Sequence, residues 1–397
     1  MSHLIELEEL MEEQSSPLLE ETDHTELLDL RRDARAYGSH SHCNAMWYNL
    51  RYRMRQLFAL PPGAPKRIAQ ILYAITLVSF GIFIAFISNA IVRWKTADPF
   101  DLFFATFWDN TPHSAYKPAK YPIEFFGNVL PIPCHSHNDY WRRTPLFAAL
   151  GSGCISVEAD VFYRNGDLYV GHTENALHGS RTLESMYINR LVDLLDAMNP
   201  TKWKAKDPKG VFYNEPKQSL TLIVDFKTEG IDTWKALHKQ LQPLRERDWL
   251  TYWNGTHRVD RPLTIVASGA ASRDIAVSNG PKRDIFLDAP LDELDRKSDD
   301  GEQLMYNESN SYLASVNFYK AVGSVFRGKI NDEQLQVLRH QIRSAKERGL
   351  VPRYWGTPRW PRGLRDEVWG ILVREEVGLL NVDDLRAVRK GGWGFRS

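Results

Sequence analysis

The stretch LTLIVDFK (220–227), followed by DTWKALHKQLQPLRER (232–247), decides the fold class of this chain. The first segment is an apolar run rich in β-branched residues, with its charged residues only at the end, which is typical of a strand buried in a parallel sheet. The second segment repeats its apolar residues at helical spacing, with charged residues between them. A buried strand followed by an amphipathic helix predicts one β–α unit.

Seven further segments have the same strand-like character. They are VLPIPCH (129–135), ISVEADV (155–161), LTIVASG (263–269), DIFLDAP (284–290), LASVNF (313–318), LVPRYWG (350–356) and GLLNV (378–382). Helical patterns lie between several of them, for instance NDEQLQVLRHQIRSAKER (331–348). Eight strands that alternate with helices predict an α/β fold, a parallel (β/α)8 TIM barrel over residues 121–397.

Chemically reactive side chains lie at the ends of the first three strand candidates and of the short segment DLYVGH (167–172). They are His135, Glu158, Asp160, His172, Asp225 and Lys227. Glu158 and Asp160 are two residues apart, so both point to the same side of their strand, and Asp225 and Lys227 repeat that arrangement. Because catalytic groups of TIM barrels lie at the carboxyl ends of the strands, we expect this set to meet there.

The three carboxylates of Glu158, Asp160 and Asp225 would repel one another if they converged unpaired in a barrel mouth. A hard divalent cation with oxygen ligands relieves this repulsion, so the sequence predicts one Mg²⁺ or Ca²⁺ ion. The alternative is a set of buried ion pairs that only close the barrel. It explains one acid–base pair more easily than three carboxylates, a lysine and two histidines.

Residues 68–92 contain no charged residue and predict one transmembrane helix, since about 20 apolar residues cross a bilayer core. More basic residues precede this segment than follow it, which places the N-terminus in the cytosol and the barrel in a lumen, endomembrane or vacuolar, with a mitochondrial association left open. The sequons at Asn254 and Asn307 are candidate glycosylation sites in that lumen.

The remaining regions are a disordered, acidic cytosolic tail (1–67) and a linker (93–120). The tail contains a pattern that resembles an acidic dileucine sorting motif, DHTELL (23–28). The net charge is zero, which offers no field for nucleic acid, so none is expected as a partner. We expect Cys134 and Cys154 to stay unbridged, because the end of one strand and the start of its parallel neighbour lie at opposite ends of a barrel.

The motifs HSHN, SVEADV, VGH and LIVDFKT occur in the order found in the PLC-like phosphodiesterase superfamily. More closely, residues 125–390 resemble the fungal altered inheritance of mitochondria protein 6 family in SHNDYWRRTPLFAAL, SVEADV, RYWGTPRWP and LLNVDDL. The resemblance implies a TIM barrel, one divalent metal and cleavage of a phosphodiester. It covers most of the chain beyond the apolar segment.

Residue by residue, the resemblance assigns metal binding to the three carboxylates and acid–base catalysis to His135 and His172. Lys227 would stabilise charge on a phosphoryl oxygen, and Asn138 and Trp355 would contact substrate. We expect His137 to turn away from His135 and to contribute only to the wall of the site.

The chain also departs from glycerophosphodiesterases. Ser136-His137-Asn138 replaces their Arg-Gly after the first histidine, and Asp225 resembles the sphingomyelinase D pattern. The expected activity is therefore a membrane-anchored, metal-dependent phosphoric diester hydrolase or lyase acting on a lipid-derived phosphodiester, with glycerophosphodiesters as a further substrate class. The alternative is a catalytically inactive, membrane-anchored barrel that acts as a binding or scaffold protein.

Overall fold

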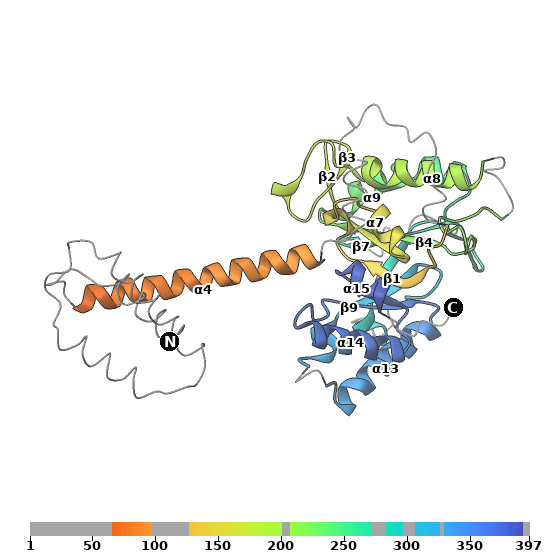
Figure 1. Ribbon diagram of the computed structural model, residues 1–397. Helices are drawn as coiled ribbons and strands as arrows, with labels where there is room; N and C mark the ends of the chain where they lie inside the picture. Colours follow the sequence, from red (N-terminus) through yellow and green to blue (C-terminus); the bar gives the residue numbers. More distant parts are fainter. Residues whose placement is uncertain are drawn as a thin grey trace, which may run out of the picture. The chain divides into compact units, whose positions relative to one another are not determined.

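The computed structural model (Figure 1) describes residues 66–96, 127–200, 207–271, 283–296, 306–325 and 329–391. Residues 1–65, with the predicted disordered tail and its dileucine motif, lie outside the described residues, as do residues 97–120 of the predicted linker. The chain divides into two units, Met1–Ile91 and Val92–Ser397.

Helix α4 (Lys66–Thr96) contains the predicted membrane span. Its stretch Ile71–Ser88 has a mean hydropathy of 2.3, and no part of that stretch is buried within the structure. Its 31 residues extend about 46 Å, more than the roughly 30 Å of a bilayer core. By length and composition, α4 is able to cross a membrane.

The second unit is a closed barrel of eight parallel strands within the described part of the chain. The strands are β1 (Ile132–Ser136), β2 (Cys154–Arg164), β4 (Leu220–Phe226), β7 (Leu263–Gly269), β8 (Phe286–Pro290), β9 (Ser311–Asn317), β10 (Val351–Trp355) and β11 (Leu379–Val382). They pair in this order, and β1 pairs with both β2 and β11, which closes the barrel. All eight predicted strands and the TIM barrel are confirmed.

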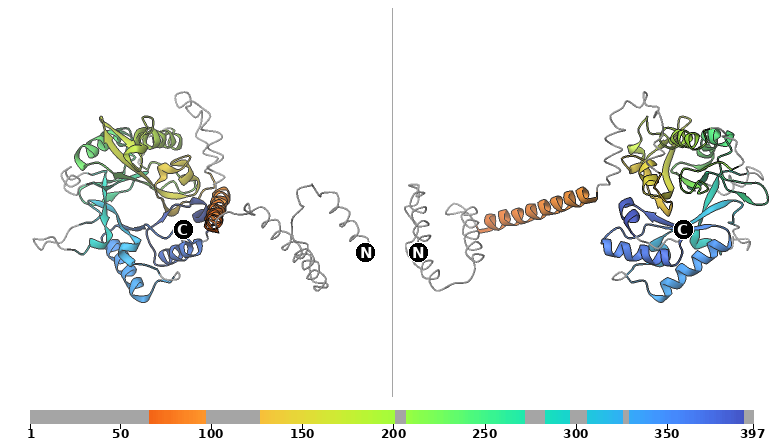
Figure 2. Two further views of the ribbon diagram at one scale, coloured as in Figure 1. Left: turned by 90° about the vertical axis from the view of Figure 1, so that its left-hand side faces the viewer. Right: turned by 45° about the vertical axis from the view of Figure 1, so that its right-hand side comes forward.

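Short strands and helices connect and surround the barrel (Figures 1 and 2). The α-helices are α7 (Phe147–Gly151), α8 (Asn189–Met198), α9 (Gly230–Gln240), α10 (Gln242–Glu246), α12 (Phe318–Val322), α13 (Asp332–Glu347), α14 (Arg362–Arg374) and α15 (Leu385–Lys390). Strand β3 (Asp167–Val170) pairs antiparallel with β2, and β5 (Tyr252–Trp253) pairs with β6 (Arg258–Val259). Single turns of tighter or wider helix span Asp139–Trp141, Glu174–Ala176, Glu184–Ile188 and Leu291–Glu293.

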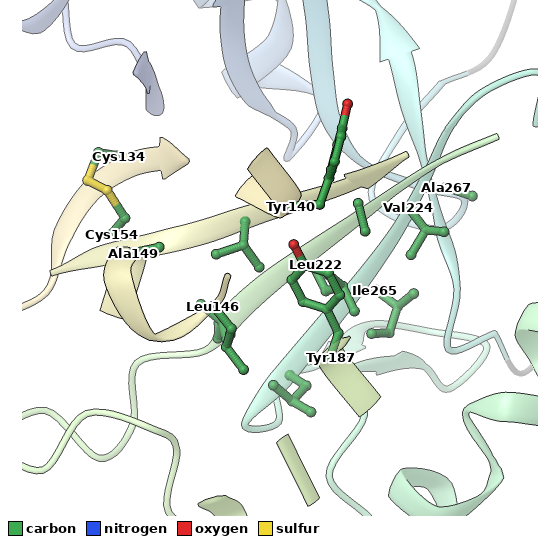
Figure 3. Packing of buried hydrophobic residues seen from close by; sticks show 14 of the residues in the cluster. Cys134, Tyr140, Leu146, Ala149, Cys154, Tyr187, Leu222, Val224, Ile265 and Ala267 are labelled. Carbon is green, nitrogen blue, oxygen red and sulfur yellow. A yellow bond between two sulfur atoms is a disulfide. The ribbon is translucent and has the colours of Figure 1, made fainter. Parts of the chain in front are cut away.

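The alternation of residues along the strands separates two apolar clusters. Leu222 and Val224 of β4 belong to the larger cluster, which includes Ile265 and Ala267 of β7 and Tyr187 (Figure 3). The opposite face of four strands forms a small separate cluster of Ile223, Val266, Leu313 and Leu379. Because Asp225 follows Ile223 by two positions, it shares that second, inward face, and so do Glu158 and Asp160 of the neighbouring β2. The candidate site residues therefore lie on the inner face of the barrel, on the carboxyl-end side of this small apolar cluster.

Cys134 and Cys154 form a disulfide with a Cα–Cα distance of 4.7 Å (Figure 3), so the prediction that they stay unbridged is wrong. Strand β1 continues to Ser136, which puts Cys134 in the middle of that strand rather than at its end. Cys154 is the first residue of β2 and pairs with Ile132, and an irregularity in the β1–β2 register follows directly. The two cysteines therefore lie at the same level of the barrel.

We expect the double variant Cys134→Ser/Cys154→Ser to lower the free energy of unfolding by about 3 kcal/mol, because a crosslink across 20 residues restricts the unfolded chain. Denaturant unfolding of the purified protein under non-reducing conditions measures this difference. A reductant should bring the wild type close to the double variant and leave the variant unchanged. Equal unfolding curves for the two oxidised proteins would show that the bond contributes nothing to stability.

Candidate active site

The register of the strands brings the predicted carboxylates together. Asp160 of β2 pairs directly with Asp225 of β4, and Asp225 pairs with Ser268 of β7. Ser268 Oγ donates a hydrogen bond to Asp225 Oδ1 at 2.8 Å. Gly269 has φ of +67°, and a side chain at this position would clash with the Asp225 carboxylate. A glycine is therefore required where the chain passes this carboxylate.

The Asp160 carboxylate contacts several polar side chains of the site. Its Oδ2 atom lies 2.7 Å from the Tyr140 hydroxyl, 3.0 Å from Lys227 Nζ and 3.0 Å from His172 Nδ1. Burial and the nearby Glu158 raise the pKa of Asp160 above its ordinary value. Burial would lower the pKa of Lys227, but its contacts with Asp225 and Asp160 raise it overall. Lys227 is thus a fixed cation between two carboxylates.

The loop after β1 is held in a strained but anchored conformation. Asn138 has φ of +49° and Leu146 has φ of +67°, both in a region that non-glycine residues rarely adopt. The buried Asp139 carboxylate accepts hydrogen bonds from Ser136 Oγ (2.7 Å), from the Leu146 amide (2.6 Å) and from the Tyr187 hydroxyl (2.9 Å). Asp139 therefore fixes the loop that carries Asn138 and its neighbours.

The Glu158 carboxylate contacts the loop that follows β1. The backbone amide of Asn138 donates to Glu158 Oε2 at 2.8 Å, and the Asn138 side-chain oxygen lies 2.8 Å from the Tyr140 hydroxyl. The Nε2 atoms of His135 and His137 lie 3.6 and 3.8 Å from Glu158 Oε2. Burial would raise the pKa of Glu158, but His135 and Arg353 hold it below its ordinary value.

His135 is fully buried, with 0% of its surface exposed. Its Nδ1 atom lies 2.7 Å from Ser156 Oγ, and its Nε2 atom has no hydrogen-bond partner among the described residues. Burial and the charge of Arg353 lower the pKa of His135 to about 4. This histidine is therefore neutral at physiological pH and shielded from solvent.

His137 does not turn away from His135, in contrast to our expectation. The two residues are two positions apart, so they share a side, and both approach the same carboxylate oxygen of Glu158. The His137 side chain is 17% exposed, and its Nδ1 atom lies 2.8 Å from Asp383 Oδ1. Burial would raise the pKa of Asp383, but the contacts with His137 and Arg359 lower it overall.

His172 and Trp355 lie at the outer part of the site. The His172 side chain is 47% exposed and its ring centre is 5.0 Å from that of Trp141, which is itself 58% exposed. Trp355, a predicted substrate contact, is the last residue of β10 and is half-exposed. The structure thus gathers His135, Asn138, Glu158, Asp160, His172, Asp225 and Lys227 by direct contacts, and it places Trp355 at the carboxyl end of its strand.

Sequence reasoning missed a buried charged group on the far side of the barrel. Arg353 of β10 lies 3.2 Å from Asp288 of β8, 3.3 Å from Asn381 of β11 and 3.8 Å from Glu158 of β2. Each of these polar residues stands at an inward position of a strand that otherwise reads as apolar. The signal in the sequence was a charged residue inside a strand segment that is otherwise apolar.

The net charge of these side chains would be balanced by a divalent cation. Among the described residues, four carboxylates face two permanent cations: Glu158, Asp160, Asp225 and Asp288 against Lys227 and Arg353. When all are ionised, two negative charges remain, which is the charge that one Mg²⁺ or Ca²⁺ ion balances. In the described part of the chain no three such side chains are already arranged as a metal cage, and Lys227 stands between two of the carboxylates. Glu158, Asp160 and Asp225 are the oxygen donors that would hold the ion.

Comparisons with known proteins identify the family of this chain. An AIM6-like phosphodiesterase domain model matches residues 123–288. The chain is 39% identical over 282 residues to the altered inheritance of mitochondria protein 6 homolog of Arthroderma benhamiae, covering 68% of this chain and 87% of that protein. It is 37% identical over 266 residues to altered inheritance of mitochondria protein 6 of Eremothecium gossypii, covering 64% and 68%. A crystal structure of a glycerophosphoryl diester phosphodiesterase from Parabacteroides distasonis aligns with 67% of this chain and 88% of that chain, at 13% identity and a TM-score of 0.34, too low to support an argument. The chain belongs to the altered inheritance of mitochondria protein 6 family.

Proposed function

We propose that this chain is a membrane-anchored, metal-dependent phosphoric diester hydrolase or lyase that acts on a lipid-derived phosphodiester. The observation that carries the proposal is the cluster at the carboxyl ends of β2 and β4. There Glu158, Asp160 and Asp225 lie with Lys227, between two histidines that each contact a carboxylate. A bound Mg²⁺ or Ca²⁺ ion would act as a Lewis acid on a phosphoryl oxygen.

We assign the acid–base pair to His137 and His172, in place of His135 and His172. In each of these two residues Nδ1 is held by a carboxylate, Asp383 or Asp160, which leaves Nε2 to exchange a proton with substrate. One histidine would take a proton from the attacking group, which is water in hydrolysis or a substrate hydroxyl in the lyase reaction. The other would give a proton to the leaving oxygen. His135 is buried and neutral, so its role is to support Glu158 from within the barrel.

Lys227 supplies the fixed positive charge that the reaction needs. Its ammonium group is partly exposed and faces both Asp160 and Asp225, so it is available to a phosphoryl oxygen that approaches the same carboxylates. Asn138 and Trp355 would contact substrate, as the resemblance implies. The exposed Trp141 ring beside His172 adds apolar surface next to the reacting group, which favours a substrate with an apolar part.

The proposed substrate class rests on this apolar surface and on α4, which would keep the barrel beside a membrane. The experiment is a screen of the purified full-length chain against lysophospholipids, sphingolipids and glycerophosphodiesters, with and without a chelator. Metal-dependent loss of one class supports the proposal, and product analysis separates hydrolysis from cyclic phosphate formation. No turnover of any class, by folded protein supplied with metal, would favour the inactive binding or scaffold barrel.

We further propose that the barrel matures in an oxidising lumen, with the N-terminus in the cytosol. The Cys134–Cys154 disulfide supports this placement, because such bonds form and persist in oxidising compartments. The two candidate sequons differ in access. Asn254 is exposed between β5 and β6, whereas Asn307 is half-buried. The side-chain oxygens of both accept the backbone amide two residues on, at 2.9 Å from Thr256 and 3.0 Å from Ser309, so exposure is what distinguishes the two sequons.

We therefore expect a glycan on Asn254 and none on Asn307. Digestion of sealed microsomes with protease should spare the barrel, and endoglycosidase should shift the mobility of the wild type but not of Asn254→Gln. Asn307→Gln is the matched control and should shift like the wild type. If the barrel is digested in sealed microsomes and carries no glycan, then it lies on the cytosolic side and the proposed placement is wrong.

A further inference from the structure

The guanidinium group of Arg353 lies inside the barrel and is almost fully buried, with 4% of the residue exposed. A buried arginine is costly unless its N–H groups are paired. Arg353 Nε donates to Ser315 Oγ of β9 at 2.9 Å, Nη1 donates to Asn381 Oδ1 at 3.3 Å, and Nη2 donates to Asp288 Oδ2 at 3.2 Å. Three strands on one side of the barrel therefore fix the position of a single cation.

The remaining contact of this cation reaches across the barrel to Glu158 of β2. Arg353 Nη1 lies 3.8 Å from Glu158 Oε1, while the Asn138 amide holds the other oxygen, Oε2, at 2.8 Å. One oxygen of the carboxylate thus faces a cation inside the barrel at ion-pair distance, and the other accepts a hydrogen bond from the loop after β1. Both contacts act on the same buried group, which is 7% exposed.

We propose that Arg353 is a positioning residue that orients Glu158 of the candidate site from inside the barrel, with Asp288 holding Arg353 in turn. The role of Glu158 as a cation ligand rests on the proposed function, but its orientation by Arg353 does not. Arg353 is almost fully buried, so we assign it no contact with substrate. Asp288 completes the arrangement as the second anion of the same guanidinium group.

The sign of the change in cation affinity distinguishes positioning from a simple charge effect. Removing a positive charge beside Glu158 would, by electrostatics alone, strengthen the binding of a divalent cation. Losing the contact that orients the carboxylate would weaken it, and outer contacts of metal ligands typically contribute about 10–100-fold in affinity. A positioning role therefore predicts weaker binding after a substitution that makes the site more negative.

The test uses the full-length chain in detergent, with Mn²⁺ as the probe and bound ion measured by electron paramagnetic resonance. Arg353→Met should weaken Mn²⁺ binding about 10–100-fold. Arg353→Lys keeps the charge without the forked geometry and should recover part of the loss. Arg245→Met is the control, since Arg245 of α10 is partly buried and pairs with Asp284, which precedes β8 at the amino end of the barrel strands. It should lower thermal stability and leave Mn²⁺ affinity unchanged.

A second measurement does not depend on the metal. If Arg353 holds Glu158, Arg353→Met should lower the unfolding midpoint much less in a Glu158→Gln background than in the wild type. Equal effects in both backgrounds, or unchanged or tighter Mn²⁺ binding by a folded Arg353→Met chain, would overturn the proposal. A wild type that binds no Mn²⁺ but shows this coupling would refute the metal-dependent function and still support the positioning role.

Discussion

Replacing His137 by alanine is expected to lower turnover of a phosphodiester about 10²–10⁴-fold, and His172→Ala should have an effect of similar size. Each imidazole has one nitrogen fixed by a carboxylate and the other turned toward the site, so each loses a positioned proton donor or acceptor. Steady-state rates on the same substrate, together with thermal melts, measure the two effects separately. The melting temperatures should change little, because neither side chain is fully buried.

His135 and His178 provide the matched comparisons. His135→Ala removes a fully buried ring from the barrel interior, so a lower melting temperature should accompany any loss of rate. His178 is exposed and its side chain hydrogen-bonds only Ser180 among the described residues, so His178→Ala should leave both quantities unchanged. A His137→Ala chain with full turnover, beside an inactive and stable His135→Ala chain, would return the acid–base role to His135.

Replacing Asp225 by alanine should weaken binding of the divalent cation by more than about 100-fold, since even the outer contacts of metal ligands contribute roughly 10–100-fold. The variant removes one of three carboxylate donors and leaves Lys227 with only Asp160 as its partner. Turnover should fall at low metal concentration and recover in part at high concentration. Glu158→Ala should behave in the same way. A metal titration of the rate, with calorimetric measurement of the affinity, tests both variants.

The histidine variants are the control for this experiment, because their low rates should not recover at any metal concentration. The two groups of variants are therefore expected to separate by their response to metal. If Asp225→Ala keeps the wild-type affinity while its rate falls, then Asp225 is no ligand, and its contact with Lys227 is the reason for its effect.

The fold could be predicted from the sequence because each predicted apolar run overlaps one barrel strand, with ends that differ by at most three residues. The pairing of Asp160 with Asp225 could also be expected, since equal positions at the ends of adjacent parallel strands meet. The disulfide could not, because it depends on where β1 ends and on an irregularity in its register with β2. Strand β1 begins three residues later than the predicted segment and ends one residue beyond it, so Cys134 lies in its middle and the expectation for Cys134 was reversed.

The residues on the far side of the site could not be predicted from the sequence either. Arg353, Asp288 and Asn381 are separated by up to 93 residues in sequence, and only barrel closure brings them to Glu158. His137 is a different case, because strand alternation by itself should have placed it on the same side as His135. What the alternation does not reveal is how deep each ring lies, and depth decides that His135 is buried while His137 is partly exposed.

If the carboxylate cluster and its histidines cleave phosphodiesters with a divalent cation, the reaction should depend on that ion. The most direct measurement is release of a chromogenic leaving group from a phosphodiester by the purified full-length chain, before and after a chelator and after re-addition of Mg²⁺ or Ca²⁺. We predict turnover that the chelator abolishes and that one of these ions restores in the wild type but not in His137→Ala. Absence of turnover by a folded, metal-supplied wild type, or turnover that is unaffected by the chelator, would contradict the account.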